Sequence, residues 1–104
     1  MKREKGKNGN YVCPCCGYAT LGEIDEYEIC HLCFWEDDGQ DDPQENENWG
    51  GPNKLSLAEA RANYINIGAC DPKDLTNVKA PNSNDENIRN YKLVNGKAVE
   101  NKNT

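Results

Sequence analysis

Two Cys-x-x-Cys pairs constrain this chain more than any other feature of its sequence. The pairs are Cys13/Cys16 and Cys30/Cys33, and thirteen residues separate them. Structural zinc is held by four thiolate or imidazole ligands at the corners of a tetrahedron, and one Cys-x-x-Cys turn places two sulfur atoms at neighbouring corners. The pairs therefore predict one bound Zn2+, or another tetrahedral metal such as iron, with all four cysteines as ligands. Because such a shell leaves no position for water, we expect a structural site rather than a hydrolytic one.

The composition explains why the chain needs such a site. Only 36% of the 104 residues are hydrophobic, 29% are charged, and the mean hydropathy is −1.00. Ordering a residue costs about 1.5 kcal/mol of conformational entropy, so a core this small needs an additional cross-link. The basic residues before position 10 are followed by no apolar stretch, and no segment is long enough to span a membrane. We therefore expect a cytoplasmic protein, in which paired cysteines bind metal rather than form disulfides.

The two other cysteines and the single histidine have no assigned place in this site. Cys15 lies inside the first pair and is interpreted as a buried bystander; the alternative is a redox or metal-handling thiol activated beside the metal. Cys70 is interpreted as a small buried residue, and His31 as an exposed residue of the second turn. The sequence contains no nucleophile–base set and no phosphate-binding glycine loop. We therefore expect no enzymatic activity.

The sequence divides into three parts. Residues 1–10 carry four basic side chains and nothing apolar apart from Met1, so we expect a flexible basic tail. Residues 11–70 form the predicted zinc-binding domain. Within it, residues 18–21 and 27–29 have the composition of short strands, and we expect them to pair in a hairpin that lies between the two cysteine pairs. The acidic segment 37–48 contains Gly39 and Pro43 and is predicted to be a loop.

The strongest helix signal follows this loop. Ser56 and Glu59 have the spacing of a capping box, and apolar residues recur after them at intervals of three and four. Gly68 is typical of a helix end, so the prediction is a helix from Leu57 to Ile67. The expected fold is a small metal-stapled α+β domain, a zinc-ribbon-like β-hairpin with two cysteine knuckles packed on one amphipathic helix.

The polar C-terminal extension, residues 71–104, contains two competing signals. Ser83 and Glu86 have capping-box spacing and predict a short helix to about residue 91. Asn95 and Gly96 form the dipeptide most typical of a tight hairpin turn. Because an isolated hairpin is marginally stable in water, we favour the short helix followed by a partly disordered end.

Four stretches of the sequence read CPCCGY at 13–18, YEICHLCFWEDDGQD at 27–41, GPN at 51–53 and SLAEAR at 56–61. Together they resemble the CPCC family of small cysteine-rich bacterial proteins. The resemblance covers residues 11–70 in the same order. It implies a bacterial or phage source and a compact zinc-ribbon-like domain. It implies no activity, although some relatives look like accessory or immunity-type proteins.

Charge separates the remaining classes of function. Residues 11–50 hold eleven carboxylates and no lysine or arginine. Nucleic-acid affinity comes from basic side chains that neutralise phosphates, so a nucleic-acid-binding zinc ribbon ranks last. We favour a protein-interaction or accessory, inhibitory module for a basic partner, with Phe34, Trp35 and Trp49 as aromatic anchors beside the acidic loop. The other interpretation of Phe34 and Trp35 is that they fill the core under the metal. A redox or metal-handling role for Cys15 ranks second.

Overall fold

Two short β-ladders, one around each cysteine pair, begin the fold. The computed structural model describes residues 3–101. Strand β1 (Tyr11–Val12) pairs antiparallel with β2 (Ala19–Leu21), and the turn between them holds the first cysteine pair. Ile29 forms an antiparallel bridge with Glu36 across the second pair. The predicted hairpin between residues 18–21 and 27–29 is therefore wrong, because each knuckle pairs the residues on its own two sides.

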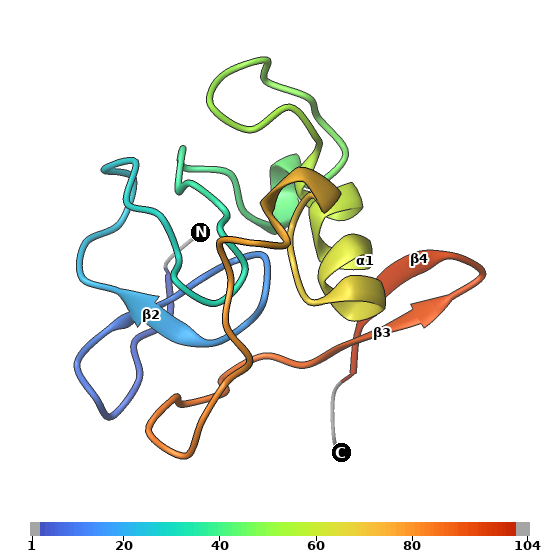
Figure 1. The fold of residues 1–104 in the computed structure, drawn as a ribbon. Coiled ribbons are helices and arrows are strands. Elements are labelled where there is room, and N and C mark those ends of the chain that lie inside the picture. The colour runs from blue at the N-terminus through green and yellow to red at the C-terminus, as the bar shows by residue number, and fades with distance from the viewer. Residues whose placement is uncertain (1–2, 102–104) are drawn as a thin grey trace.

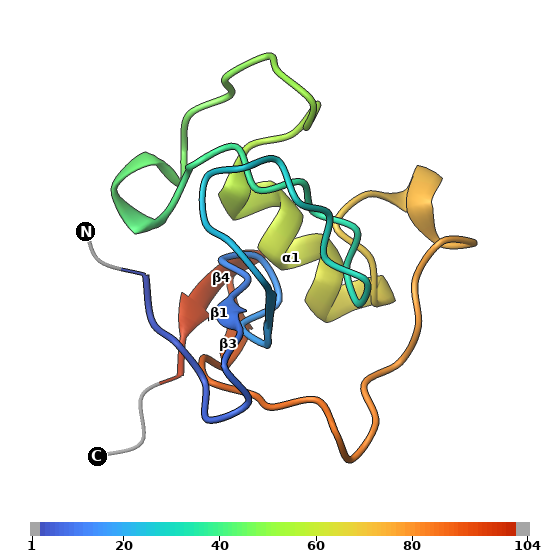
Figure 2. The same cartoon turned by 90° about the vertical axis from the view of Figure 1, so that its left-hand side faces the viewer.

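Helix α1 (Leu57–Ile67) has the predicted bounds and the predicted caps. The Glu59 backbone N–H donates to the Ser56 hydroxyl oxygen at 3.2 Å, and the Ser56 N–H donates to the Glu59 carboxylate at 3.0 Å. Gly68 ends the helix with a φ of 82°. Figure 1 shows α1 between the cysteine-bearing loops and the C-terminal hairpin, and Figure 2 shows it near the centre of the molecule.

That hairpin consists of β3 (Tyr91–Val94) and β4 (Lys97–Glu100), which pair antiparallel in a regular register. The short helix predicted between Ser83 and residue 91 is absent from residues 3–101, whose only α-helix is α1. Asn95 and Gly96 turn the chain with φ angles of 53° and 79°. The hairpin is stable because both of its strands pack against α1. An isolated hairpin has no such packing.

Two 3-10 turns and a long connection complete the chain. They are η1 (Asp42–Gln44) and η2 (Pro72–Asp74). The connection from η2 to β3, orange in Figures 1 and 2, runs along the outside of the molecule. It nevertheless touches the first ladder, since the Ala19 N–H donates to the Glu86 carbonyl at 2.8 Å.

The N-terminal segment differs from the expected flexible tail. Arg3 is only 8% exposed, and the Val12 N–H donates to the Glu4 carbonyl oxygen at 2.9 Å. A tight turn follows, in which the Gly6 N–H donates to the Asn10 carbonyl at 2.8 Å. The buried arginine is the physical reason for the difference, because its ion pairs hold the segment on the domain. Residues 1 and 2 lie outside the described part of the chain.

The core is built around the cysteines. Leu21, Leu32, Trp35, Leu57 and Ala60 surround them, each no more than 1% exposed. The structure is thus a small α+β domain with two β-hairpins, one α-helix and a cluster of four cysteines. Among residues 3–101 no helix has the length and apolar character needed to cross a membrane.

Candidate metal centre

The first knuckle is a tight turn closed by two backbone hydrogen bonds. The Gly17 N–H donates to the Cys13 carbonyl at 2.9 Å, and the Cys13 N–H donates to the Tyr18 carbonyl at 2.8 Å. Gly17 has a φ of 83°, which residues with a Cβ adopt only at a cost. A Cβ at this position would also lie 2.0 Å from the Arg89 carbonyl oxygen. Glycine therefore avoids a conformational cost here, and the Arg89 carbonyl leaves no space for a side chain.

The second knuckle is closed by the same two backbone hydrogen bonds as the first. The Phe34 N–H donates to the Cys30 carbonyl at 2.8 Å, and the Cys30 N–H donates to the Trp35 carbonyl at 2.9 Å. Phe34 takes the place of the glycine and has a φ of 72°. This left-handed conformation is uncommon for a bulky residue. The hydrogen bonds of the turn therefore hold Phe34 in a locally strained conformation.

The two knuckles bring four sulfur atoms together. The ligand atoms of Cys13, Cys16, Cys30 and Cys33 all lie within 4.8 Å of one another, and all four residues are buried. The Sγ atoms of Cys13 and Cys33 are 3.6 Å apart, and those of Cys16 and Cys30 are 3.7 Å apart. A tetrahedron with metal–sulfur bonds of about 2.3 Å has edges of about 3.8 Å. The donor set therefore fits a tetrahedral metal ion.

Neighbouring donors are placed to stabilise negative charge on sulfur. The Thr20 hydroxyl donates to Cys30 Sγ at 3.1 Å, and the Leu32 N–H donates to the same atom at 3.4 Å. The Trp35 N–H donates to Cys33 Sγ at 3.5 Å. Groups of this kind orient metal ligands and tune their basicity. The strands and turns of the fold thus supply an outer layer of hydrogen bonds to the cluster.

The thiols perturb one another strongly. Burial raises the pKa of Cys13, Cys16 and Cys33, whereas hydrogen bonds with the three other cysteines lower the pKa of Cys30. Without a cation the cluster favours a single thiolate, because further buried negative charges would repel one another. A divalent cation removes this repulsion, so metal binding would release protons.

The remaining cysteines are buried beside this cluster rather than in it. Cys15 is 1% exposed and Cys70 is 4% exposed. Burial raises the pKa of the Cys70 thiol, and the nearby Asp74 carboxylate acts in the same direction. The His31 side chain is 55% exposed, and its Nε2 lies 3.3 Å from an Asp85 carboxylate oxygen. It is not one of the residues gathered at the cluster.

The acidic loop is organised differently from the solvated face that its composition suggests. Asp37 and Asp41 are buried and pair with Arg3 at 3.2 and 2.8 Å. Arg89 donates to Asp41 at 3.0 Å. Arg61 donates to Asp42 at 2.7 Å and to Glu45 at 3.1 Å, the latter two being half-exposed. The loop is therefore largely neutralised from within the fold.

Sequence reasoning missed this arginine–carboxylate cluster. It uses all three arginines of a chain that otherwise carries nine lysines. The choice of arginine was the available signal, because its planar fork suits buried carboxylate pairs better than lysine does. The aromatic anchors divide as well: Trp35 is in the core, Phe34 is half-buried against it, and Trp49 is 47% exposed.

One comparison with known proteins finds a match. A family model described as cysteine-rich CPCC matches residues 11–85. This confirms the resemblance deduced from the sequence, and the match continues beyond residue 70. Neither the curated proteins nor the solved structures contain a match.

Proposed function

This chain belongs to the cysteine-rich CPCC family, and we propose that it is a non-enzymatic zinc-binding module that binds a basic protein partner as an accessory or inhibitor. Zinc is the metal that best suits four buried thiolates with tetrahedral spacing. Its role is structural, and the four cysteines are its ligands. The interaction itself rests on a separate feature, the exposed loop between the two knuckles.

That loop, residues 22–29, is the single observation that carries the proposal. Its apolar side chains Ile24, Tyr27 and Ile29 are 40%, 58% and 44% exposed. Exposed carboxylates alternate with them at Glu23, Asp25 and Glu26, and no ion pair within residues 3–101 neutralises these three. Apolar anchors with an unpaired acidic rim suit a partner that is basic around an apolar patch.

The loop is also held in shape. The Glu28 carboxylate accepts hydrogen bonds from the N–H groups of Gly22 and Glu23, at 2.9 to 3.2 Å. The Tyr27 N–H donates to the Asp37 carbonyl at 3.0 Å. Asp25 and Tyr27 have φ angles of 57° and 59°, an uncommon conformation that these bonds maintain. A loop ordered before binding loses less entropy when a partner docks.

The unpaired negative charge lies chiefly in loop 22–29 rather than in the acidic segment 37–48 that the sequence suggested. Most carboxylates of residues 36–47 face arginines or, for Asp38, the Gln40 N–H inside the fold, so the field that would steer a partner comes chiefly from loop 22–29. The whole chain carries a formal net charge of −6, which adds to the attraction of a basic surface.

The alternative functions have less support. Cys15 is only 1% exposed, whereas reactive thiols are accessible to their targets. A nucleic-acid-binding surface would need clustered lysine or arginine side chains. The three arginines instead form ion pairs within the fold.

The test compares charge reversal inside and outside the loop. Binding of the zinc-loaded protein to a panel of basic ribonucleases and small toxins is measured by calorimetry at low and high salt. We expect Glu26→Lys to weaken binding about tenfold at low salt, in line with the loss of a rim charge at an interface. Glu47→Lys makes the same charge change at an exposed site outside the loop and should have little effect. Binding that is absent, insensitive to salt, or equally weakened by both variants contradicts the proposal.

A further inference from the structure

The C-terminal hairpin is a two-stranded sheet, so one edge of β4 pairs with no strand among residues 3–101. The Asn101 N–H donates to the Asn90 carbonyl at 2.7 Å, and this bond fixes the phase of the ladder. Hydrogen-bonded and non-hydrogen-bonded pairs alternate along an antiparallel ladder, so the N–H and C=O groups of Ala98 and Glu100 point away from β3. No backbone group elsewhere in residues 3–101 bonds to them.

This edge has few of the features that usually prevent strand addition. Edge strands are commonly protected by a proline, by a β-bulge or by charged side chains. The sequence of β4 contains no proline, and its register with β3 has no bulge. Its one lysine, Lys97, lies at the end of the strand, next to the turn. The edge at Ala98 is therefore open to a further strand.

A groove of about 880 Å³ lies along this edge. Residues 96–99 form one wall, and no residue of β3 belongs to it. Because successive side chains of a strand point to opposite faces, a wall made of consecutive β4 residues is the edge of that strand. Figure 1 shows β4 beside α1. The facing wall is formed by residues of α1 that are not buried, namely Ala58, Glu59, Ala62, Asn63 and Asn66.

The charge of the groove selects among the segments that could enter it. Its wall carries three carboxylates and one lysine: Glu45, Glu59, Asp71 and Lys97. Glu45 is already paired with Arg61 at 3.1 Å. Glu59 and Asp71 form no ion pair within residues 3–101. The groove therefore favours a segment that carries positive charge.

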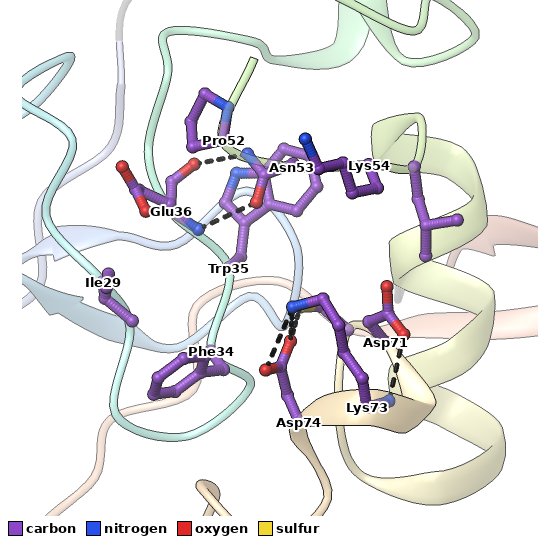
Figure 3. Close-up of a pocket in the computed structure, with 12 residues that line it drawn as sticks. Ile29, Phe34, Trp35, Glu36, Pro52, Asn53, Lys54, Asp71, Lys73 and Asp74 are labelled. Atoms are coloured by element: carbon purple, nitrogen blue, oxygen red, sulfur yellow. Dashed lines mark hydrogen bonds and ion pairs between the residues drawn. The ribbon is translucent and has the colours of Figure 1, made fainter. Parts of the chain in front are cut away.

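Asp71 shows why the fold itself does not supply this positive charge. Its carboxylate lines both the groove and the small cavity drawn in Figure 3. It accepts the backbone N–H of Lys73 at 3.0 Å. The Lys73 ammonium instead donates to the Asp74 carboxylate, at 3.0 and 3.2 Å, as Figure 3 shows. A lysine or arginine from outside the chain would give Asp71 the missing counter-ion.

We propose that the groove between α1 and β4 binds an extended segment of another protein, which adds a third strand to the hairpin and presents a lysine or arginine to Glu59 and Asp71. Backbone hydrogen bonds to Ala98 and Glu100 hold the segment, as in other cases of strand addition. The side chains that alternate with the basic residue pack beside Val99 on the outer face. The groove shares no residue with loop 22–29, and Figure 1 shows the two on opposite sides of the molecule. It is therefore a second binding surface, separate from the one proposed above.

The test titrates a capped pentapeptide, threonine–valine–lysine–valine–threonine, into the zinc-loaded protein labelled with 15N, and follows amide hydrogen exchange by NMR. When the peptide fills about nine-tenths of the sites, exchange at Ala98 and Glu100 should slow about tenfold, because only the unoccupied tenth still exchanges. Leu93 is the internal control, since its N–H points away from β4 on the other edge of the hairpin. Its exchange should stay unchanged. No saturable slowing at Ala98, or equal slowing at Leu93, overturns the proposal.

Matched variants examine the charge. Glu59→Gln removes one carboxylate from the groove, while glutamine still serves in the capping box of α1. It should weaken peptide binding about threefold, which is the value of one exposed ion pair. Glu47→Gln makes the same change outside the groove and should leave the titration unchanged. Equal effects of the two variants contradict the assignment.

Two further measurements identify the occupant. A peptide with glutamate in place of lysine should bind at least about threefold more weakly, because it loses the same ion pair. Equal binding of the two peptides overturns the choice of a basic segment. Slow exchange at Ala98 without peptide, increasing with protein concentration, would show that a second copy of this chain occupies the edge, and would also overturn the proposal.

Discussion

Gly17 and Phe34 follow the two knuckles and adopt the same left-handed backbone conformation for different reasons. Gly17 and Phe34 have φ angles of 83° and 72° and donate equivalent hydrogen bonds, yet only Gly17 is pressed against another segment. Phe34 accepts the left-handed conformation because its ring packs on the core. Conformation alone would therefore allow a side chain at position 17, and the Arg89 carbonyl excludes it.

This distinction predicts the effect of adding a methyl group. Gly17→Ala should lower the free energy of unfolding by about 2–4 kcal/mol, through left-handed strain and a clash with backbone. Gly68→Ala is the matched control, because φ is 82° there and no atom lies within 4 Å of the added carbon. It should cost only about 1 kcal/mol. Denaturant unfolding of both metal-loaded variants measures the difference, and equal losses would show that the clash with Arg89 is relieved.

Asp41 is the carboxylate with the most cationic neighbours. Burial alone would raise its pKa, but the hydrogen bond and charge of Arg89, with the charge of Arg3, lower it below the usual value. A lowered pKa means that the folded state holds the ionised form. The stabilisation is present above the unfolded pKa of about 3.9 and is lost as the pH falls through the lower folded value.

Asp41→Asn should therefore cost about 3–5 kcal/mol at neutral pH, because it leaves buried arginine charge uncompensated. The loss relative to the unmodified protein should be the same at about pH 6 and about pH 8, since Asp41 is ionised throughout that range. Denaturant unfolding at the two pH values measures it. The control is Glu47→Gln, an exposed carboxylate that should cost less than about 0.5 kcal/mol. A loss that changes between these pH values would mean that another group governs the cluster.

At the scale of elements, local signals were the reliable ones. Helix α1 has its predicted ends because Ser56, Glu59 and Gly68 act within a few residues of one another. The four cysteines meet as predicted because each pair is joined by one turn. The hairpin between the knuckles was wrong because strand composition does not identify a partner strand, and pairing across each knuckle uses shorter connections.

The features that the sequence did not predict depend on contacts between residues that are far apart in the chain. The C-terminal hairpin was rejected on its stability in isolation, whereas packing on α1 stabilises it. The arginine cluster joins residues 3, 41 and 89, and no local pattern relates positions so far apart. For the same reason, nothing in the sequence indicated that the N-terminal segment would be anchored by Arg3.

The packing of the hairpin on α1 predicts that substitutions at two neighbouring residues change the stability by different amounts. Leu93 is half-buried on the face that carries Ala98 and Tyr91, while Val94 is 43% exposed on the other. Leu93→Ala should therefore lower the free energy of unfolding by about 1.5–3 kcal/mol, whereas Val94→Ala should change it by less than about 0.5 kcal/mol. Thermal or denaturant unfolding compares the two. Equal, small effects would show that the hairpin does not contribute to the stability of the domain.

At the scale of the whole molecule, the cluster of four cysteines takes the place of a larger hydrophobic core. The described residues bury only a few large side chains, and the cysteines are at their centre. Structural zinc contributes on the order of 10–16 kcal/mol of apparent binding free energy in small domains. The stability of this fold should therefore depend on the metal more than on any single packing contact.

Metal removal provides the corresponding prediction. A strong chelator should unfold the protein cooperatively, and the near-ultraviolet dichroism of the buried Trp35 should disappear with it. Cys30→Ser should abolish stoichiometric zinc measured by native mass spectrometry. Cys70→Ser, at a buried cysteine outside the cluster, should retain one zinc per chain. A chelated protein that keeps its tertiary dichroism, or loss of zinc in both variants, would contradict a structural four-cysteine site.

The bond between Asp41 and arginines from both ends of the chain has a consequence for synthesis. A ribosome releases Arg3, both knuckles and Asp41 well before Arg89. The nascent chain can therefore gather its four cysteines, and pair Asp41 with Arg3 and Arg61, before Arg89 adds the last ion pair. A chain interrupted before residue 89 would carry both knuckles but would leave Asp41 without its ion pair to Arg89.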